Sequence, residues 1–273
     1  MALGYTMVYG IAKMLNFAHG DIIMVGAYAV ISTVSLAQLP GVVGVAVSVV
    51  VCVFLGVTIE FLAYRPLRKA PSLAVLITAI GVSYLLQSLA LLVFKSEPKA
   101  FPTIIEIPSL TFGGVVVDGM TLLTLAVTAV IMISLSLFIN KTKLGKAMRA
   151  VSEDKDAAEL MGISVNRTIT MTFAIGSALA AVASVFYGAT YTYIKPTTGS
   201  MPGIKAFTAA VIGGIGSIPG AMLGGILLGV LECFSNSVPA LAPYTDAIEF
   251  GILIILLLVR PNGILGKKRR EKV

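Results

Sequence analysis

Residues 42–59, with the sequence VVGVAVSVVVCVFLGVTI, form an uncharged apolar run that is too long and too continuous for a β-strand. Glycine is tolerated inside such a run in a membrane helix, where the backbone groups make their hydrogen bonds within the helix. Comparable runs lie on both sides of it, at about 22–39, 72–94, 121–139, 168–194, 206–231 and 247–259. The sequence therefore predicts an all-α integral membrane protein.

The composition excludes a soluble globular protein. Of the 273 residues, 57% are hydrophobic and only 12% are charged, whereas soluble domains carry about a quarter charged residues. Because one span takes roughly 20 residues, residues 1–273 predict a single transmembrane domain, a polytopic helix bundle of about eight spans that includes broken or re-entrant helices. Cys52 and Cys233 have neither disulfide-framework nor zinc-ligand spacing, so no metal site is expected.

The basic residues gather in three segments between the apolar runs, which are Arg65 to Lys69, Lys141 to Arg167 and Arg260 to Lys272. By the positive-inside rule, such segments face the cytoplasm. We therefore expect a cytoplasmic loop at 141–168 and a basic cytoplasmic tail at 261–273. The net charge of +7 then reflects this topology, and no nucleic-acid partner is expected.

This topology constrains the segment 206–231, which must begin and end on the outside. It is expected to be either a tight hairpin of two helices or a re-entrant pair, broken at its centre by GGIGSIPG, residues 213–220. The longest external connection is 95–120. Within it, 101–108 and 112–119 resemble two short strands with a glycine-containing turn, which predicts a small external hairpin.

The N-terminal apolar run is short. Met1 to Ala12 would form roughly 18 Å of helix, against a hydrocarbon core of about 30 Å, so this run cannot span the membrane alone. Either the chain begins with a half-helix, or its first helix is incomplete and continues in coding sequence upstream. We expect the incomplete first helix.

The second basic segment contains the most informative motif. In LGKAMRAVSEDKDAAELMGI, residues 144–163, Ser152 or Asp154 can cap a short helix that Gly162 ends. Such a helix would lie outside the bilayer and carry a small apolar face, formed by Ala157, Ala158, Leu160 and Met161. It fits a groove on a partner protein. The alternative is a solvated loop helix without a partner.

Asp156-Ala157-Ala158 followed by Gly162 is similar to the EAA signature with which permeases of bacterial ABC importers dock onto their ATPase subunits. Here Asp replaces the Glu of that signature, and the downstream Leu-Pro is absent. This variant resembles the branched-chain amino acid permeases. So do three further parts of the chain, which are GYTMVYG at 4–10 with NFAHGD at 16–21, GGIGSIPGA at 213–221, and RPNGILG at 260–266.

Polar residues cluster where the first long apolar run begins. Asn16, His19 and Asp21, with Gly20 among them, would be costly to bury unless they pair with one another or line water. They are therefore candidates for a translocation path or a gate. The alternative is a capping group at the cytoplasmic interface, in which Asn16 accepts from backbone amides.

The glycines of the 213–220 segment are further candidates for the path or gate, namely Gly213, Gly214, Gly216 and Gly220. Their spacing has a second interpretation. Gly216, Gly220 and Gly224 lie four residues apart, and Gly225 and Gly229 repeat this spacing one position later, a pattern that allows helix backbones to pack closely.

Three acidic residues lie in or beside apolar runs. Glu60 precedes Arg65 by about one helical turn and is expected to form an interfacial ion pair with it. Glu232 and Glu249 lie near the outer ends of their predicted helices, and an intramembrane acid is a candidate for gating or for contact with an amino group.

The sequence contains no constellation of catalytic residues and no Gly-x-x-x-x-Gly-Lys-Ser/Thr phosphate-binding loop. We therefore expect that the chain is not an enzyme and binds no cofactor itself. If ATP drives the protein, a partner subunit must bind it.

The resemblance implies the permease subunit of an ATP-driven ABC importer, a multi-pass protein of a bacterial or archaeal plasma membrane. Its implied substrates are leucine, isoleucine and valine, delivered by an external binding protein. The implied partners are a homologous permease or a second copy, two cytoplasmic ATP-binding subunits, and membrane lipid. The alternatives are a permease for urea or short amides and, in a different class, a stand-alone secondary transporter or channel.

Overall fold

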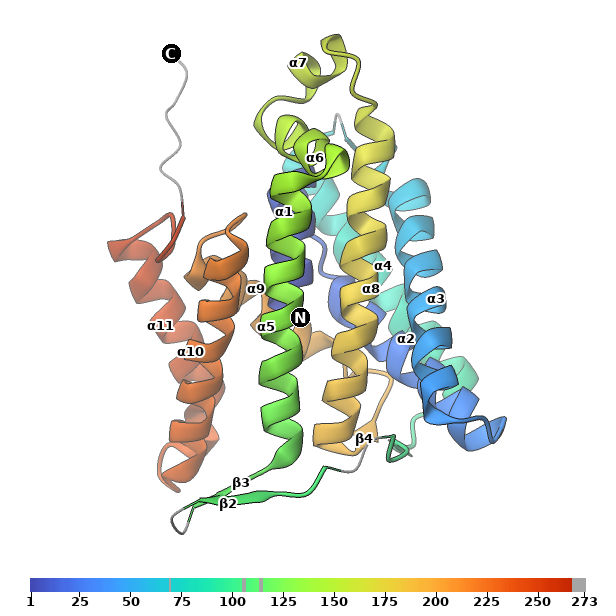
Figure 1. The fold of residues 1–273 in the computed structure, drawn as a ribbon, viewed down its shortest axis with the longest axis vertical. Helices are drawn as coiled ribbons and strands as arrows, with labels where there is room; N and C mark the ends of the chain where they lie inside the picture. The colour runs from blue at the N-terminus through green and yellow to red at the C-terminus, as the bar shows by residue number, and fades with distance from the viewer. Residues whose placement is uncertain (69, 105–106, 113–114, 267–273) are drawn as a thin grey trace.

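The computed structural model describes residues 1–68, 70–104, 107–112 and 115–266, and it is a bundle of membrane helices (Figure 1). Seven helical segments of the described residues are long and apolar enough to cross a membrane. They are α2 (His19–Ile31) with η1 (Ser32–Leu36), α3 (Gly41–Ile59) with η2 (Glu60–Tyr64), α4 (Ser72–Phe94), α5 (Gly119–Lys141), α8 (Val165–Tyr191), α10 (Ile218–Ser237), and η3 (Ala242–Tyr244) with α11 (Thr245–Val259). The predicted all-α polytopic fold is confirmed.

A shorter apolar helix, α1 (Ala2–Ala12), lies inside the bundle, where nearly all of its residues are buried. The long helices differ in how far the rest of the chain covers them. In the segment His19–Leu36, 67% of residues are buried, against 6% in Gly119–Lys141. The helices α1 and α2 are therefore inner helices, and α5 lies at the periphery.

Small residues allow α2, α3 and α8 to pack closely. A Cβ atom on Gly26 of α2 would lie 2.8 Å from Cys52 Sγ of α3, and a Cβ atom on Gly56 of α3 would collide with the side chain of Ser177 of α8. The Ser48 hydroxyl of α3 also donates to the Gly26 carbonyl over 3.0 Å. Close backbone approach and interhelical hydrogen bonds hold membrane helices together where lipid removes the hydrophobic driving force.

The segment predicted to be a broken pair is a helical hairpin. Its arms are α9 (Ser200–Gly213) and α10, and both glycines in the turn between them, Gly214 and Gly216, have positive φ angles of 104° and 86°. Ser217 then caps α10, because its hydroxyl accepts a hydrogen bond from the Gly220 amide over 3.2 Å. The predicted break at the centre of the segment is confirmed.

The external hairpin is present, but one of its predicted strands is wrong. It consists of β2 (Leu110–Phe112) and β3 (Val115–Val117), paired antiparallel, and the turn residues 113–114 lie outside the described part. Among the described residues of 101–108 there is no strand, because prolines at 102 and 108 have no N–H to donate. Instead β1 (Lys99–Ala100) pairs with β4 (Tyr193–Ile194) after α8.

The described residues of the three basic segments lie at the same end of the bundle, opposite the β2–β3 hairpin (Figure 1). One is the loop with α6 (Lys143–Glu153) and α7 (Lys155–Leu160), which projects beyond the ends of the long helices (Figure 1). This arrangement agrees with a shared cytoplasmic side. Six basic residues of these segments lie outside the described part, namely Lys69, Lys267, Lys268, Arg269, Arg270 and Lys272.

Candidate translocation path and coupling helix

The Asp21 carboxylate lies at the centre of a polar network that joins three helices. Asp21 on α2 is fully buried and accepts hydrogen bonds from the Ser83 hydroxyl and, over 3.0 Å, from the Gln87 side-chain amide, both on α4. The same Gln87 nitrogen lies 3.0 Å from the Ser200 hydroxyl on α9. Sequence reasoning identified Asp21 but missed its partners, because Ser83 and Gln87 lie within a long apolar run.

The Gln87 amide cannot donate to all of its neighbours in this network. The Gln87 nitrogen lies within hydrogen-bond distance of Asp21, Ser83 and Ser200, yet a side-chain amide carries only two N–H groups. In the part of the chain that the structure describes, no basic side chain forms an ion pair with Asp21. The carboxylate is therefore held by neutral donors alone, a costly arrangement inside a membrane protein unless a ligand or water completes it.

His19, the first residue of α2, is buried against α1. Its ring is only 1% exposed and meets the Tyr5 ring edge-on, at 5.9 Å between centroids. A Cβ atom on Gly4 would lie 2.9 Å from the His19 ring, so a glycine is needed there to make room for it. The Nε2 atom of His19 has no hydrogen-bond partner among the described residues.

The interfacial capping interpretation of this region is wrong. The residue at the N-cap of α2 is Ala18, and no side chain caps the helix. Asn16 instead accepts a hydrogen bond from the Tyr64 hydroxyl over 3.0 Å, and its side chain is buried. The structure therefore places Asn16, His19 and Asp21 inside the bundle, in contact with three different sets of neighbours.

Gly20 allows α2 to approach α9. A Cβ atom on Gly20 would collide with the Gly199 carbonyl oxygen and lie 2.8 Å from Gly203 Cα. Any side chain at this position would therefore push α9 away from α2. Because Asp21 follows directly and reaches Ser200 through the α4 amide, this contact places the start of α9 against the polar network.

The candidate glycines of the α9–α10 hairpin make backbone contacts that bring distant motifs together. Gly213 and Gly220 pack against each other across the hairpin. A Cβ atom on either residue would collide with the carbonyl oxygen of the other. The Gly216 amide donates to the Thr6 hydroxyl of α1 over 3.0 Å. The C-terminal segment also joins the turn, since the Leu265 amide donates to the Gly213 carbonyl over 3.0 Å, and Gly266 lies against Gly214.

The packing interpretation of the glycine series is correct for one of its two rows. A Cβ atom on Gly220 or Gly224 would collide with backbone of α9. In contrast, a Cβ atom on Gly225 or Gly229 would meet no atom of the described residues within 4 Å. Gly220 and Gly224 of the first row thus close the α9–α10 hairpin, whereas Gly216 lies in its turn against Gly10 of α1. The second row faces outward.

The predicted loop helix is α7. Asp154 caps it, because its carboxylate accepts from the amides of Asp156 and Ala157 at 3.0 Å each, whereas Ser152 belongs to α6. Gly162 follows the helix with a φ angle of 80°, a conformation that favours glycine. The short helix between Asp154 and Gly162 is confirmed.

The predicted apolar face of α7 is divided between two surroundings. Leu160 and Met161 are 90% and 82% exposed, and Ala157 and Asp156 are also exposed. Ala158 is only 3% exposed, because it packs into the hydrophobic core of its own chain. It therefore cannot lie in a groove of a partner, and Leu160 and Met161 form the face of α7 that is free.

The loop is tied to the inner helix α1. The Lys155 ammonium donates to the backbone carbonyl of Ala12 over 3.2 Å. Partial burial and then the positive charge of Arg68 lower the pKa of Lys155, while the neighbouring Asp156 raises it. Lys155 is therefore a partly desolvated cation whose position is fixed by the last turn of α1.

One prediction about the intramembrane acids needs correction. Glu60 does not pair with Arg65; its buried carboxylate pairs with Arg68, and Arg65 lies over the Phe61 ring at 5.3 Å from its centroid. The Arg65 guanidinium stays on the Phe61 ring, and the turn that follows η2 brings Arg68 to the carboxylate instead.

Glu232 and Glu249, the other two acids in or beside apolar runs, both pair with Lys205. The Lys205 ammonium of α9 lies 2.9 Å from Glu232, 3.0 Å from Asp246 and 3.3 Å from Glu249. Sequence reasoning missed this cluster, since its members come from α9, α10 and α11. A lysine at the edge of an apolar run was the only signal for it.

Known proteins are similar to this chain over its whole length. Residues 1–257 match the profile of the family described as branched-chain amino acid transport system / permease component. The high-affinity branched-chain amino acid transport system permease protein BraD of Pseudomonas aeruginosa is 48% identical over the whole of this chain and 92% of its own length. The high-affinity branched-chain amino acid transport system permease protein LivH of Escherichia coli K12 is 41% identical over the same shares of the two chains.

An archaeal relative, the probable branched-chain amino acid transport permease protein LivH of Methanocaldococcus jannaschii, is 29% identical over 97% of this chain and 87% of its own length. No solved structure matches. The seven apolar helices and the bacterial relatives make the chain a multi-pass protein of the bacterial inner membrane. The chain belongs to the permease family of the branched-chain amino acid transport systems.

Proposed function

We propose that the chain is the membrane-spanning permease of an ATP-driven importer that carries leucine, isoleucine and valine. It works with a homologous permease or a second copy of itself, with two cytoplasmic subunits that bind and hydrolyse ATP, and with an external protein that delivers the amino acid. The chain itself binds no nucleotide. The resemblance of its motifs and the names of its relatives support this proposal.

The free face of α7 is the observation that supports an ATP-driven transporter. Leu160 and Met161 are among the most exposed apolar side chains of the described residues, at 90% and 82%. They lie on a loop beyond the ends of the long helices (Figure 1), where lipid does not cover them. Two large apolar side chains in such a position fit a hydrophobic groove of a partner, in the manner of a short helix docking into a protein surface.

The contacts of α7 suggest how ATP binding reaches the translocation path. A force on α7 acts through Lys155 on the end of α1, and α1 contacts the α9–α10 turn through Thr6 and Gly216. It also encloses His19 through Gly4. ATP binding to the cytoplasmic subunits then shifts the population between outward-open and inward-open arrangements of these inner helices.

We assign to Asp21 the role of binding the substrate in the translocation path. The amino acids to be carried have an ammonium group and an apolar side chain. A buried carboxylate held by neutral donors can accept that ammonium, while apolar surroundings suit the side chain. In the described structure, the surrounding helices enclose Asp21 completely, so this arrangement corresponds to a closed path.

The test replaces Leu160 and Met161 together by Asp in the complex reconstituted with its ATPase subunits and binding protein. We expect the ATPase subunits to be lost during purification and leucine uptake to fall at least tenfold, because two carboxylates would have to be buried in an apolar groove. The matched control is Leu73→Asp, which changes an exposed leucine in the first turn of α4, outside α7. It is expected to retain both activities.

Normal uptake by the Leu160/Met161 variant with the ATPase still bound would overturn the docking role. The same preparation decides between the functions. Uptake by the chain without ATPase subunits would indicate a secondary transporter or channel. Transport of urea or acetamide in preference to leucine would indicate an amide permease.

A further inference from the structure

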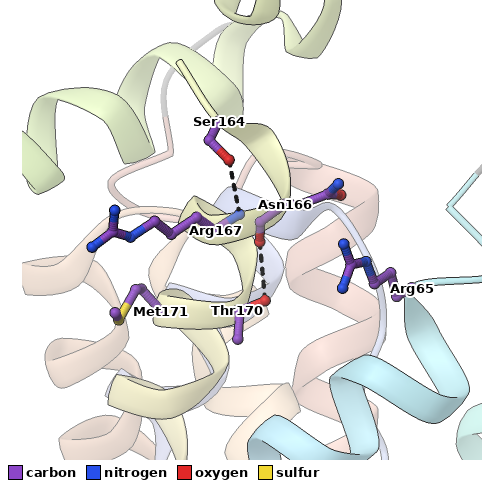
Figure 2. Close-up of a pocket in the computed structure, with 6 residues that line it drawn as sticks. All are labelled: Arg65, Ser164, Asn166, Arg167, Thr170 and Met171. Carbon is purple, nitrogen blue, oxygen red and sulfur yellow. Dashed lines mark hydrogen bonds between the residues drawn. The ribbon is translucent and has the colours of Figure 1, made fainter.

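A pocket of about 410 Å³ opens at the basic end of the bundle, and neither docking nor translocation uses it. It lies where η2 ends and α8 begins, and Figure 2 shows Arg65 reaching from η2 towards the first turns of α8. Its lining residues are Arg65, Ser164, Asn166, Arg167, Thr170 and Met171.

The charge of this pocket is not compensated. Arg65 and Arg167 are exposed, and no carboxylate of the described residues pairs with either of them. The nearby carboxylate is that of Glu60, which is fully buried and already pairs with Arg68. The Arg65 guanidinium rests on the Phe61 ring, a contact that holds the side chain beside the pocket. Two guanidinium groups are thus available to a negatively charged ligand.

The bilayer side of the pocket is apolar. Phe61 and Leu62, in the turn of η2 before Arg65, are 56% and 67% exposed. Met171, one turn into α8 from Arg167, is 38% exposed. Both helices continue from here into membrane spans. Positive charges therefore lie at the level of the headgroups, directly beside apolar side chains at the level of the acyl chains.

We propose that this pocket binds an anionic phospholipid of the cytoplasmic leaflet. The lipid phosphate contacts Arg65, and the acyl chains lie along Phe61 and Leu62. Arg167 extends on the other side of α8 (Figure 2) and adds to the positive potential that attracts the headgroup. A guanidinium is suited to a phosphate because it can donate two parallel hydrogen bonds. Basic pockets between helices on the cytoplasmic side favour such headgroups. An acidic side chain of an ATPase subunit would satisfy the arginines but would leave the apolar half uncovered.

The test uses the purified permease alone, so that it does not depend on transport or on ATPase docking. The wild type and the Arg65→Gln/Arg167→Gln double variant are extracted from membranes of phosphatidylcholine that contain phosphatidylglycerol. Retained lipid is then counted by native mass spectrometry. We expect the double variant to retain roughly tenfold less phosphatidylglycerol, since each arginine near the surface contributes about one kcal/mol to the attraction. Retention of phosphatidylcholine should be low and equal in both.

Two further variants complete the test. Arg260→Gln removes an exposed arginine at the same end but outside the pocket, and it should retain phosphatidylglycerol like the wild type. Arg65→Lys/Arg167→Lys keeps both charges and should recover most of the retention if the double Gln variant is folded. Equal retention by the wild type and the double Gln variant would overturn the proposal. In that case, loss of ATPase binding by the double Gln variant in the assembled complex would assign the pocket to the ATPase.

Discussion

The Lys155 ammonium of the cytoplasmic loop donates to the backbone carbonyl of Ala12, 143 residues earlier in the chain. Ala12 is the last residue of α1, and a cation at that point satisfies a carbonyl that has no partner within the helix and complements the helix dipole. The free face of α7 lies directly after Lys155. This hydrogen bond therefore joins the surface that we assign to the ATPase to the innermost helix of the bundle.

Replacing Lys155 by Met is expected to uncouple the importer. Methionine keeps most of the side-chain volume but loses the donor, and the exposed face of α7 is unchanged. ATPase subunits should remain bound, while the leucine transported per ATP hydrolysed should fall about tenfold, the effect of losing one charge-assisted hydrogen bond. Lys146→Met, an exposed lysine on α6, is the control. A normal ratio of transport to hydrolysis in Lys155→Met would exclude this route.

The two glycine rows of α10 give a matched pair of variants. In Gly224→Ala the new methyl group would collide with the Ala209 carbonyl of α9, whereas in Gly225→Ala it meets open space. We expect Gly224→Ala to destabilise the protein by about 1–3 kcal/mol, the usual cost of overpacking, and Gly225→Ala to be neutral or slightly stabilising. Thermal unfolding in detergent measures both. Equal midpoints would mean that the hairpin can relax without cost.

The sequence was sufficient for what depends on composition and local pattern. Long uncharged runs predict the spans, the glycines at 213–220 predict the break, and Asp154 with Gly162 predicts both ends of α7. Two of the failures share a cause, which is contact between distant segments. The small side chain of Ala158 would fit a groove on a partner, but it fits the core of its own chain equally well. Nothing local to α9 indicates that Lys205 meets acids of α10 and α11.

The Lys205 cluster predicts a specific pattern of loss and rescue. Lys205→Met would leave Glu249, whose side chain is 1% exposed, without its cation. Removing one partner of a buried pair costs about 3–5 kcal/mol, so the variant should be poorly folded. Adding Glu249→Gln removes the unpaired charge and should restore much of the stability. Thermal unfolding of the single and double variants tests this prediction. A Lys205→Met variant as stable as the wild type would contradict it.

The sidedness can be tested with single cysteines. Cys233 is exposed and is first replaced by Ser, while Cys52 is buried. Cysteines at Ser109, beside the external hairpin, and at Glu159, on α7, are both at exposed positions. In intact cells, a thiol reagent that cannot cross the membrane should label the first and not the second, because the basic segments face the cytoplasm. Labelling of both positions in intact cells would require another topology.

The sharpest prediction concerns Asp21. Asp21→Asn keeps the size of the side chain and leaves an oxygen to accept from Gln87, but it removes the negative charge. If the carboxylate accepts the ammonium of the amino acid, leucine uptake should fall about a hundredfold, since a charge-assisted contact would be lost inside a membrane protein. The protein should stay folded and its ATPase subunits bound, because the α7 surface is unaffected. Ser83→Ala removes one donor to the same carboxylate and keeps the charge, so it should transport far better than Asp21→Asn. If Asp21→Asn transports leucine normally, Asp21 only joins α2 to α4. A loss of folding in Asp21→Asn equal to that in Ser83→Ala would also assign it that structural role.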